Sequence, residues 1–259
     1  MNMGLSAKVI VVTGAASGIG LAAARVAAAE GASSLLLTDR DAPGLLKAAA
    51  QLGPVCEAES VIADLTDAAA PSAIAAAAKA RFGRIDGLVN AAGLTTRGSF
   101  VTGTEAVWDE LFAVNARASF FLMQEAIRDM RARGAPGSIV NILSMNAHCG
   151  RAELAIYSGT KGALATLTRN AANAHMSDRI RVNGINLGWT ATESEHRMQS
   201  EILGRGPGWE SEEAARLPLG RLVSAEEAAR LAVFLLGDAS VPMSGALIDF
   251  EQQVTGAIG

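Results

Sequence analysis

The sequence lacks the features of a membrane-embedded or nucleic-acid-binding protein. No window reaches the roughly eighteen uncharged apolar residues that a membrane helix needs. The N-terminal stretch has neither the apolar length nor the small-residue cleavage site of a signal peptide. The net charge of -4 and the pI near 5.5 provide no basic surface for nucleic acid or for an anionic membrane. We therefore expect a cytoplasmic protein that binds neither.

Cysteine is almost absent, which argues against a disulfide framework. The two cysteines, Cys56 and Cys149, lie far apart, with no CxxC motif and no histidine at a zinc spacing. His148 directly precedes Cys149, but two adjacent residues do not form a metal site. We expect reduced thiols, as in a cytosolic protein, and no bound metal.

The apolar residues are arranged as short runs separated by alanine-rich and charged segments of helical spacing. Apolar runs that alternate with helices indicate βαβ units, in which a parallel sheet is buried on both faces. No repeat, linker or composition break divides the chain, so we predict one α/β domain over residues 1–259. Strands are expected at 8–12, 33–38, 60–63, 86–90, 138–144, 179–187 and 245–250, and helices at 18–30, 41–52, 67–82, 104–133, 153–176 and 224–237.

One segment departs from this alternation. Residues 189–216 are polar, contain the run G-R-G-P-G, and follow the sixth predicted strand. Ligands of open α/β sheets bind beyond the carboxyl ends of the strands. We therefore predict that this segment is a substrate lid, with a plain surface excursion as the alternative.

The first predicted strand runs into T-G-A-A-S-G-I-G at residues 13–20 and then into a helix. Its glycines permit a tight turn and a close approach of the backbone to a pyrophosphate, which the free N–H groups of the helix N-terminus would bind. The spacing GxxxGxG differs from the standard GxGxxG dinucleotide fingerprint. We predict a dinucleotide phosphate site, with a ligand-free glycine turn as the alternative.

The second predicted strand ends at Asp39, nineteen residues after Gly20. An acidic residue at about this distance hydrogen-bonds the adenosine ribose hydroxyls and repels a 2′-phosphate. A pair of unit charges at ~5 Å and an effective dielectric of ~20 interacts by roughly 3 kcal/mol. Arg40 could soften the repulsion, but the glycine loop holds no basic residue. We predict that the cofactor is NAD, with NADP less favoured.

The only tyrosine, Tyr157, lies in the stretch I-Y-S-G-T-K, and Lys161 follows it four positions later. On a helix these two side chains share a face. Free tyrosine has a pKa near 10, and a cation within about 4–6 Å lowers the pKa of an acidic group by about 1–3 units. We therefore predict that Tyr157 transfers a proton, with its pKa lowered by Lys161.

The motifs TGAASGIG, LVNAAG, FAVNARASF, SIVNILS and YSGTK follow one another in this order. With them the chain resembles the short-chain dehydrogenase/reductase family over essentially its whole length. The resemblance implies a single Rossmann-type domain with a doubly wound, seven-stranded parallel sheet and helices on both faces, usually assembled as a homotetramer. Hydride transfer in such enzymes belongs to a nicotinamide cofactor.

The resemblance also implies four catalytic residues. Tyr157 would be the general acid or base, and Ser144, thirteen residues before it, would steady the substrate oxygen. Lys161 would lower the pKa of Tyr157 and bind the nicotinamide ribose. Asn115 would hold a proton-relay water.

A set of cofactor-binding residues is implied in the same way. Asp64 and Leu65 match the pair that flanks the adenine, and Thr190 and Thr192 match positions that hold the nicotinamide carboxamide. For Asp64 and Asn90, a polar side chain that stabilises a turn is the alternative. The full set is Gly14, Ser17, Gly18, Ile19, Gly20, Asp39, Arg40, Asp64, Leu65, Asn90, Gly93, Tyr157, Lys161, Thr190 and Thr192.

The sequence departs from the family pattern in three places. The usual N-N-A-G reads N-A-A-G at 90–93, and the usual Pro-Gly after the sixth strand reads Leu187-Gly188, which removes a fixed φ from the lid hinge. The usual V-D-G-G reads I-D-F-E-Q at 248–252. The altered C-terminal segment 248–259 could line a pocket, including that of a neighbouring subunit.

The expected substrate pocket combines hydrogen-bonding groups with an indole face, which suits a sugar or polyol. In the alternative, Trp189 packs in the core and the charged residues face water. The predicted lining is Ser144, Asn146, His148, Tyr157 and Trp189, with Glu193, Glu195 and His196 from the lid.

The function we predict is an NAD-dependent oxidoreductase that acts on a secondary alcohol or ketone. An NADPH-linked 3-oxoacyl or other carbonyl reductase is one alternative, but it predicts a basic residue in the glycine loop or in place of Asp39. A non-catalytic dinucleotide-binding regulator is the other. It would not need the matched set of Asn115, Ser144, Tyr157 and Lys161.

Overall fold

The computed structural model describes residues 3–254, and within them seven strands form one parallel sheet. The expected doubly wound Rossmann-type sheet is confirmed: its strand order is β3-β2-β1-β4-β5-β6-β9. The order reverses between β1 and β4, where ligands of such sheets bind. The strands are β1 (Val9–Thr13), β2 (Ser34–Asp39), β3 (Glu57–Ile62), β4 (Gly87–Asn90), β5 (Gly137–Ile142), β6 (Ile180–Leu187) and β9 (Leu247–Phe250).

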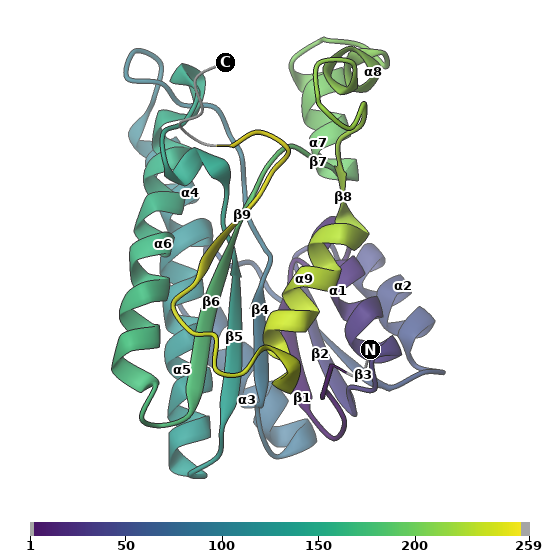
Figure 1. Cartoon of the computed structure of the whole chain (residues 1–259), viewed down its shortest axis with the longest axis vertical. Helices are drawn as coiled ribbons and strands as arrows, with labels where there is room; N and C mark the ends of the chain where they lie inside the picture. Colours follow the sequence, from purple (N-terminus) through teal and green to yellow (C-terminus); the bar gives the residue numbers. More distant parts are fainter. Residues whose placement is uncertain (1–2, 255–259) are drawn as a thin grey trace.

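Helices cover both faces of the sheet, as Figure 1 shows. Each face has its own buried apolar cluster, and the long helices divide between the two clusters. No helix within residues 3–254 is long and apolar enough to cross a membrane. One face carries α1 (Gly18–Ala29), α2 (Ala42–Leu52) and α9 (Ala225–Leu236), and the other carries α3 (Ala70–Phe82), α5 (Ser119–Ala132) and α6 (Ala155–His175).

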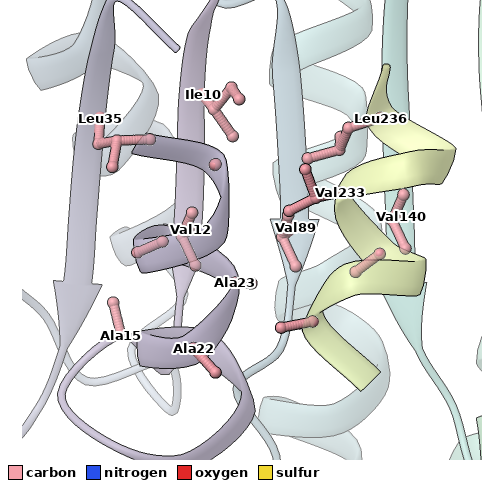
Figure 2. Packing of buried hydrophobic residues seen from close by; sticks show 14 of the residues in the cluster. Ile10, Val12, Ala15, Ala22, Ala23, Leu35, Val89, Val140, Val233 and Leu236 are labelled. Carbon is pink, nitrogen blue, oxygen red and sulfur yellow. The ribbon is translucent and has the colours of Figure 1, made fainter. Parts of the chain in front are cut away.

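The continuous apolar runs are strands because both of their faces are buried. Successive side chains of a strand point to opposite sides, so Ile10 and Val12 join the cluster under α1 and α9, whereas Val11 joins the other cluster. Figure 2 shows Val12 beside α1, with Ile10 further along the same strand and Val233 of α9 next to Val89. The small alanine side chains of α1 leave space for the helix to pack closely on the sheet.

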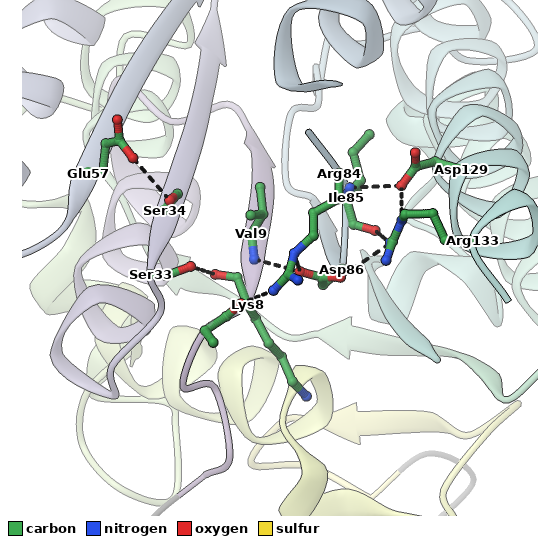
Figure 3. Close-up of polar contacts among 11 residues, drawn as sticks. Lys8, Val9, Ser33, Ser34, Glu57, Arg84, Ile85, Asp86, Asp129 and Arg133 are labelled. Carbon is green, nitrogen blue, oxygen red and sulfur yellow. Dashed lines mark hydrogen bonds and ion pairs between the residues drawn. The ribbon is translucent and has the colours of Figure 1, made fainter. Parts of the chain in front are cut away.

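A network of charges holds the amino-terminal end of the sheet (Figure 3). Asp86 accepts a hydrogen bond from the Val9 backbone N–H at 3.0 Å, and Asp129 accepts one from the Ile85 N–H at 2.9 Å. Arg133 pairs with both carboxylates, at 2.9 Å to Asp129 and 3.2 Å to Asp86. These contacts tie β1, β4 and α5 together at the end of the sheet opposite to the carboxyl ends of the strands.

The predicted helix at 104–133 is continuous but contains a π-helical segment. It consists of α4 (Glu105–Phe112), a π-helical segment η1 (Ala113–Ala118), and α5. Segments of this kind often occur at functional sites, and this one contains Asn115.

The segment 189–216 is more ordered than its sequence indicates. It leaves the sheet through β7 (Thr190–Ala191), which pairs in parallel with β8 (Val223–Ser224). Between them lie α7 (Glu193–Arg197), the π-helical η4 (Met198–Ile202) and α8 (Trp209–Ala214). Figure 1 shows α7 and α8 standing above the carboxyl end of the sheet. The short 3-10 helices are η2 (Met145–Ala147), η3 (Ala152–Leu154) and η5 (Asp238–Ser240).

Candidate active site

A large cleft lies along the carboxyl ends of the strands, bounded by the segment 189–216. Its volume is about 1610 Å³, above the ~300–1,000 Å³ of an ordinary ligand pocket, and therefore sufficient for a dinucleotide together with a substrate. Most predicted site residues line it, whereas Asn90, Asn115 and His148 do not. The predicted residues in its lining are Gly14, Ser17, Gly18, Ile19, Gly20, Asp39, Arg40, Asp64, Leu65, Gly93, Ser144, Asn146, Tyr157, Lys161, Trp189, Thr190, Thr192, Glu193 and Glu195.

The glycine loop has the shape that a pyrophosphate requires. Gly14 has a φ of +65°, and a Cβ there would lie 2.9 Å from the Cα of Ala92. A Cβ on Gly20 would lie 2.1 Å from the Gly14 carbonyl oxygen. Ser17 is the N-cap of α1, and its hydroxyl makes no capping hydrogen bond. The first N–H groups of α1 therefore face the cleft without a side-chain acceptor, so this end of the site fits a dinucleotide phosphate.

Asp39 lies at the end of β2, beside the glycine loop. Its carboxylate accepts hydrogen bonds from the backbone N–H of Ala16 at 3.1 Å and of Asp41 at 3.0 Å. These bonds fix the negative charge at the place where the adenosine ribose of a dinucleotide would lie. Arg40 lines the same part of the cleft and is exposed.

The Asp64 side chain stabilises a local turn. It accepts hydrogen bonds from the N–H and the hydroxyl of Thr66, both at 2.9 Å, and these bonds lower the pKa of Asp64. The Asp64 carboxylate therefore has the turn-stabilising role that we gave as the alternative. Asp64 and Leu65 both line the cleft.

Asn90 faces the interior instead of the cleft. Its amide donates to Asn141 Oδ1 at 2.8 Å. The neighbouring turn is held by Thr13, whose hydroxyl oxygen accepts hydrogen bonds from the N–H groups of Ala91 at 3.1 Å and Ala92 at 3.0 Å. Thr13, which sequence reasoning did not single out, thus positions the turn after β4 against the glycine loop.

Ser144, Tyr157 and Lys161 meet at the foot of the cleft. The Ser144 hydroxyl is near enough to the Tyr157 phenol to lower its pKa. Lys161 Nζ donates to the carbonyl oxygen of Ile142 at 2.8 Å and lies 5.8 Å from the centroid of the Tyr157 ring. All three predicted residues are buried, so few water molecules compete with their contacts.

Burial dominates the electrostatics of this cluster. It raises the pKa of Tyr157 to about 12, although the hydrogen bond from Ser144 acts in the opposite direction. Burial also lowers the pKa of Lys161 to about 8. In the polypeptide without cofactor, burial therefore outweighs the lowering of the Tyr157 pKa that we expected from Lys161. A further positive charge beside the phenol is needed, and an oxidised nicotinamide carries one.

Asn115 positions two elements around this cluster. Its Oδ1 accepts from the Leu94 N–H at 2.8 Å, while its Nδ2 donates to the Leu94 carbonyl at 2.9 Å and to the Thr160 hydroxyl at 3.1 Å. The side chain thus joins the loop after β4 to α6. It lies directly behind Gly93, where a Cβ would be 3.5 Å from both Asn115 Oδ1 and Lys161 Nζ.

The start of the segment 189–216 lies beside the glycine loop. Thr192 caps α7 by accepting from the Glu195 N–H at 3.2 Å, and its methyl group lies 3.5 Å from a Cβ built on Gly18. Thr190 lines the cleft as well, and its hydroxyl donates to the Gly188 carbonyl at 3.1 Å.

The predicted substrate residues separate into two groups. Asn146 and Trp189 line the cleft, and Asn146 Nδ2 donates to Ser144 Oγ at 3.2 Å. His148 lies outside the cleft lining, where its Nε2 is 2.9 Å from Asp249 Oδ1. His196 is outside the lining too, because its Nδ1 accepts from Trp209 Nε1 at 3.3 Å.

The C-terminal segment lies against the same cleft. Glu251 and Gln253 are part of its lining, and a Cβ on Gly188 would lie 2.0 Å from Glu251 Oε2. Residues 255–259 of the predicted pocket-lining segment 248–259 lie outside the described residues. In residues 3–254 no group of three His, Cys, Asp or Glu side chains is arranged to hold a metal ion.

Several known proteins resemble this chain over nearly its full length. It is 35% identical to 2-(S)-hydroxypropyl-CoM dehydrogenase 3 of Xanthobacter autotrophicus, over 98% of this chain and 99% of that protein. It is 37% identical to galactitol 2-dehydrogenase (L-tagatose-forming) of Cereibacter sphaeroides, over 92% and 91% of the two chains. The solved structure of L-sorbose reductase from Gluconobacter frateurii, complexed with NADPH and L-sorbose, matches with a TM-score of 0.93 at 29% identity and covers 100% of both chains.

The family model described as Enoyl-(Acyl carrier protein) reductase matches residues 14–251, which include the glycine loop and the Ser144–Tyr157–Lys161 cluster. This match covers most of the chain, and the relatives above share its full length. The chain therefore belongs to the short-chain dehydrogenase/reductase family.

Proposed function

We propose that this protein is an NAD-dependent dehydrogenase that interconverts a secondary alcohol and a ketone on a sugar or polyol. The observation that carries the proposal is the buried cluster of Ser144, Tyr157 and Lys161 at the foot of a cleft whose far end has a glycine loop. A regulator that only bound a dinucleotide would not need a buried phenol next to a serine hydroxyl and a lysine ammonium.

The chain supplies proton transfer and orientation. The Tyr157 hydroxyl exchanges a proton with the substrate oxygen, and Ser144 hydrogen-bonds to that oxygen. Lys161 holds the ribose next to the nicotinamide, and Asn115 keeps the surrounding elements in place and holds a relay water at η1. A bound nicotinamide supplies the acceptor or donor of the hydride.

Asp39 supports NAD as the cofactor. Its carboxylate is fixed by two backbone N–H groups and cannot swing away from a 2′-phosphate without losing them. The L-sorbose reductase relative was solved with NADPH, so Arg40 is the residue through which this chain would accept NADP. Within residues 13–20 there is no basic side chain to assist Arg40.

The substrate class rests on the cleft and on the relatives. Asn146 and Ser144 present hydrogen-bonding groups, and Trp189 presents an indole on the same wall. The relatives include a galactitol dehydrogenase and an L-sorbose reductase. Residues 189–216 serve as the lid over this substrate, since Thr192 at their start already contacts Gly18 of the glycine loop.

An exposed aromatic surface supports a homotetramer. Phe120 and Phe121 of α5 are 38% and 41% exposed, and Trp108 of α4 is 50% exposed. Phe120, Phe121 and Phe112 line one groove between α4 and α5. Burying such a face against a second copy removes apolar surface from water. Cys56 and Cys149 are both free thiols, which is consistent with the cytoplasm as the location.

The test is formation of NADH or NADPH by the purified protein with a panel of alditols, aldoses and simple secondary alcohols. NAD-dependent turnover of a polyol, lost in Tyr157→Phe, supports the proposal. Turnover only with NADP would favour the carbonyl-reductase alternative. Tight NADH binding without turnover of any compound would favour the regulator.

A further inference from the structure

We propose that the substrate of this cleft carries a carboxylate, held by Arg97 and Arg151, so that the enzyme acts on a polyhydroxy acid in preference to the corresponding neutral polyol. This inference rests on the proposed function and specifies its substrate. Arg97 and Arg151 both line the cleft together with Tyr157 and Trp189.

Arg97 is held rigidly beside the catalytic tyrosine. Its Nη1 donates to the Thr95 carbonyl at 2.8 Å. Its loop is pinned to the segment that leads into α6, because the Gly98 N–H donates to the Glu153 carbonyl at 2.9 Å and the Ile156 N–H donates to the Gly98 carbonyl at 3.1 Å. The guanidinium is therefore close enough to act electrostatically on the Tyr157 phenol.

The Arg97 guanidinium has unused donors. Its Nε is buried and has no hydrogen-bond partner within the described residues, and no carboxylate of residues 3–254 lies within ion-pair distance of it. A buried charged donor without an acceptor is costly. An anionic ligand would supply the missing acceptor, and the planar guanidinium fork matches a carboxylate in two parallel hydrogen bonds.

Arg151 supplies a second cation to the cleft, from the segment that the Gly98–Glu153 hydrogen bond holds next to the Arg97 loop. Its guanidinium lies 4.8 Å from the centroid of the Trp189 ring. Like Arg97, it has no ion-pair partner in the part of the chain that the structure describes. Stacking on an indole leaves the edge of a guanidinium free to donate hydrogen bonds.

The acidic residues of this end of the cleft are mostly engaged by the protein. Glu195 accepts from Trp189 Nε1 at 2.9 Å and from Gln199 Nε2 at 2.7 Å. Glu213 pairs with Arg205 at 2.8 Å and with Arg216 at 3.3 Å. The donors to Glu195 are neutral, so its negative charge remains and acts on Tyr157 in the opposite direction to Arg97. Arg97 and Arg151 themselves have no carboxylate partner among residues 3–254.

The remaining charges in the lining are of both signs. On α7, Glu193 and Arg197 both line the cleft without an ion-pair partner among residues 3–254, and their charges are opposite. Glu251 accepts a hydrogen bond from the Gln252 N–H and packs over Gly188 at the β6 end. The cations Arg97, Arg151, Arg197 and Arg216 are thus matched in number by Glu193, Glu195, Glu213 and Glu251 in the lining. The carboxylate is therefore assigned to the unpaired donors of Arg97 and Arg151, and not to a net positive charge of the cleft.

Arg205 provides a matched control. Its guanidinium also lies near the Trp189 ring, 6.0 Å from the centroid, but it pairs with Glu213 and does not line the cleft. Replacing Arg205 removes a stacked cation from Trp189 without removing a free cation from the cleft. Arg97→Gln and Arg151→Gln remove the free cations, and Arg151→Lys keeps the charge but removes the planar fork.

The experiment compares acids with alditols of equal chain length, such as gluconate with glucitol. We expect kcat/KM for the acid to exceed that for the alditol by about tenfold or more, because a charge-assisted hydrogen bond is stronger than one between neutral groups. The ratio of kcat/KM for the acid to kcat/KM for the alditol should fall toward one in Arg97→Gln and in Arg151→Gln. It should be partly retained in Arg151→Lys and unchanged in Arg205→Gln. The ratio, rather than the rate, is the readout because Arg97 also acts on the pKa of Tyr157.

Calorimetric binding of the same pairs to the protein loaded with NADH gives a second readout. It separates failure of this inference from failure of the proposed function. Turnover of alditols as efficient as that of acids, or a ratio that is insensitive to Arg97→Gln and Arg151→Gln, would overturn the inference alone. Equal weak binding of acid and alditol by the wild-type protein, together with no turnover, would overturn both. A preference for phosphorylated polyols over carboxylates would also contradict the assignment.

Discussion

Lys161 and Tyr157 share one face of α6, but the ammonium of Lys161 is directed to the backbone of β5. Its Nζ donates to the Ile142 carbonyl at 2.8 Å and is 5.8 Å from the centroid of the phenol ring. Both side chains are buried, and burial acts on them in opposite directions: it raises the pKa of Tyr157 and lowers the pKa of Lys161. This arrangement has a consequence for stability as well as for catalysis.

The free energy of unfolding should increase with pH because of Lys161. Its pKa is about 8 in the folded protein and about 10.4 in an unfolded chain, so in between the unfolded state binds more protons. Stability therefore rises as pH increases through this window. Relative to Lys161→Met, the free energy of unfolding of the wild-type protein should rise by roughly 2–3 kcal/mol from pH 7 to pH 10. Urea unfolding at several pH values measures this difference, and parallel curves for the two proteins would contradict it.

Removing the phenol hydroxyl should abolish catalysis without loss of cofactor. Tyr157→Phe keeps the ring that packs in the buried cluster and deletes only the proton-transfer group. We expect kcat to fall by about 10²–10⁴-fold, with NADH affinity unchanged within about twofold, as measured by nicotinamide fluorescence. An equal loss of NADH binding would instead assign Tyr157 a structural role.

Ser144→Ala should shift the pH profile of alcohol oxidation. The Ser144 hydrogen bond lowers the pKa of Tyr157, so its removal raises that pKa. Because oxidation needs the deprotonated phenol, the rising limb of kcat/KM against pH should move to higher pH. A profile that falls in height but keeps its position would show that Ser144 acts on the substrate alone.

Asp39→Asn should reduce the discrimination against NADP. Loss of the charge removes a repulsion of roughly 3 kcal/mol between Asp39 and a 2′-phosphate, so the ratio of kcat/KM for NAD to that for NADP should fall by about a hundredfold. The hydrogen bond from Ala16 is weakened as well, so NAD affinity should also decline. Arg40→Gln is the counterpart, and it should lower the residual use of NADP. A ratio unchanged in Asp39→Asn would contradict the proposed cofactor preference.

The lid should depend on one buried aromatic contact. Trp209 is 1% exposed and stacks on Trp189 with centroids 5.6 Å apart. Trp209→Ala removes this contact, and we expect faster limited proteolysis within 198–216 and a higher KM for the substrate, with little change in NADH affinity. Trp108→Ala is the control, since Trp108 is half-exposed on α4. Equal proteolysis of both variants would argue against a separate lid.

The parts of the fold that could be predicted are those encoded by local patterns. The strands are continuous apolar runs because both faces of a parallel sheet are covered. The glycine loop can be recognised in the sequence because Gly14 and Gly20 lie too close to backbone atoms for any residue with a Cβ. The predicted helix at 104–133 has nearly the observed bounds, but its π-helical segment η1 could not be predicted, because such a segment shifts the register without changing the composition. The order of the lid depends on the Trp189–Trp209 stack, a tertiary contact with no local sequence signal.

The candidate site divides in the same way. Ser144, Tyr157 and Lys161 carry a spacing that a single sequence reveals, whereas Thr13 and Arg97 acquire their roles only through partners far along the chain. Thr13 binds the turn after β4, and Arg97 is brought beside α6 by the pairing of Gly98 with Glu153. The pKa of Tyr157 could not be foreseen either, since burial, its largest cause, is a property of the folded chain.

The aromatic groove between α4 and α5 should be an interface between copies of this chain. A charge in the groove cannot be buried without a large desolvation cost. We therefore expect Phe121→Asp to dissociate the wild-type assembly. Gel filtration with light scattering measures the mass of both proteins. Phe100→Asp is the control, because Phe100 is fully exposed in the loop after β4 and lies outside the groove. A wild-type protein that is already monomeric, or equal dissociation by both substitutions, would remove the groove as the contact. Dissociation by Phe121→Asp alone would locate the interface at the groove. The more exposed Phe100 would then tolerate the same charge, so exposure of an aromatic side chain would not be sufficient for an interface.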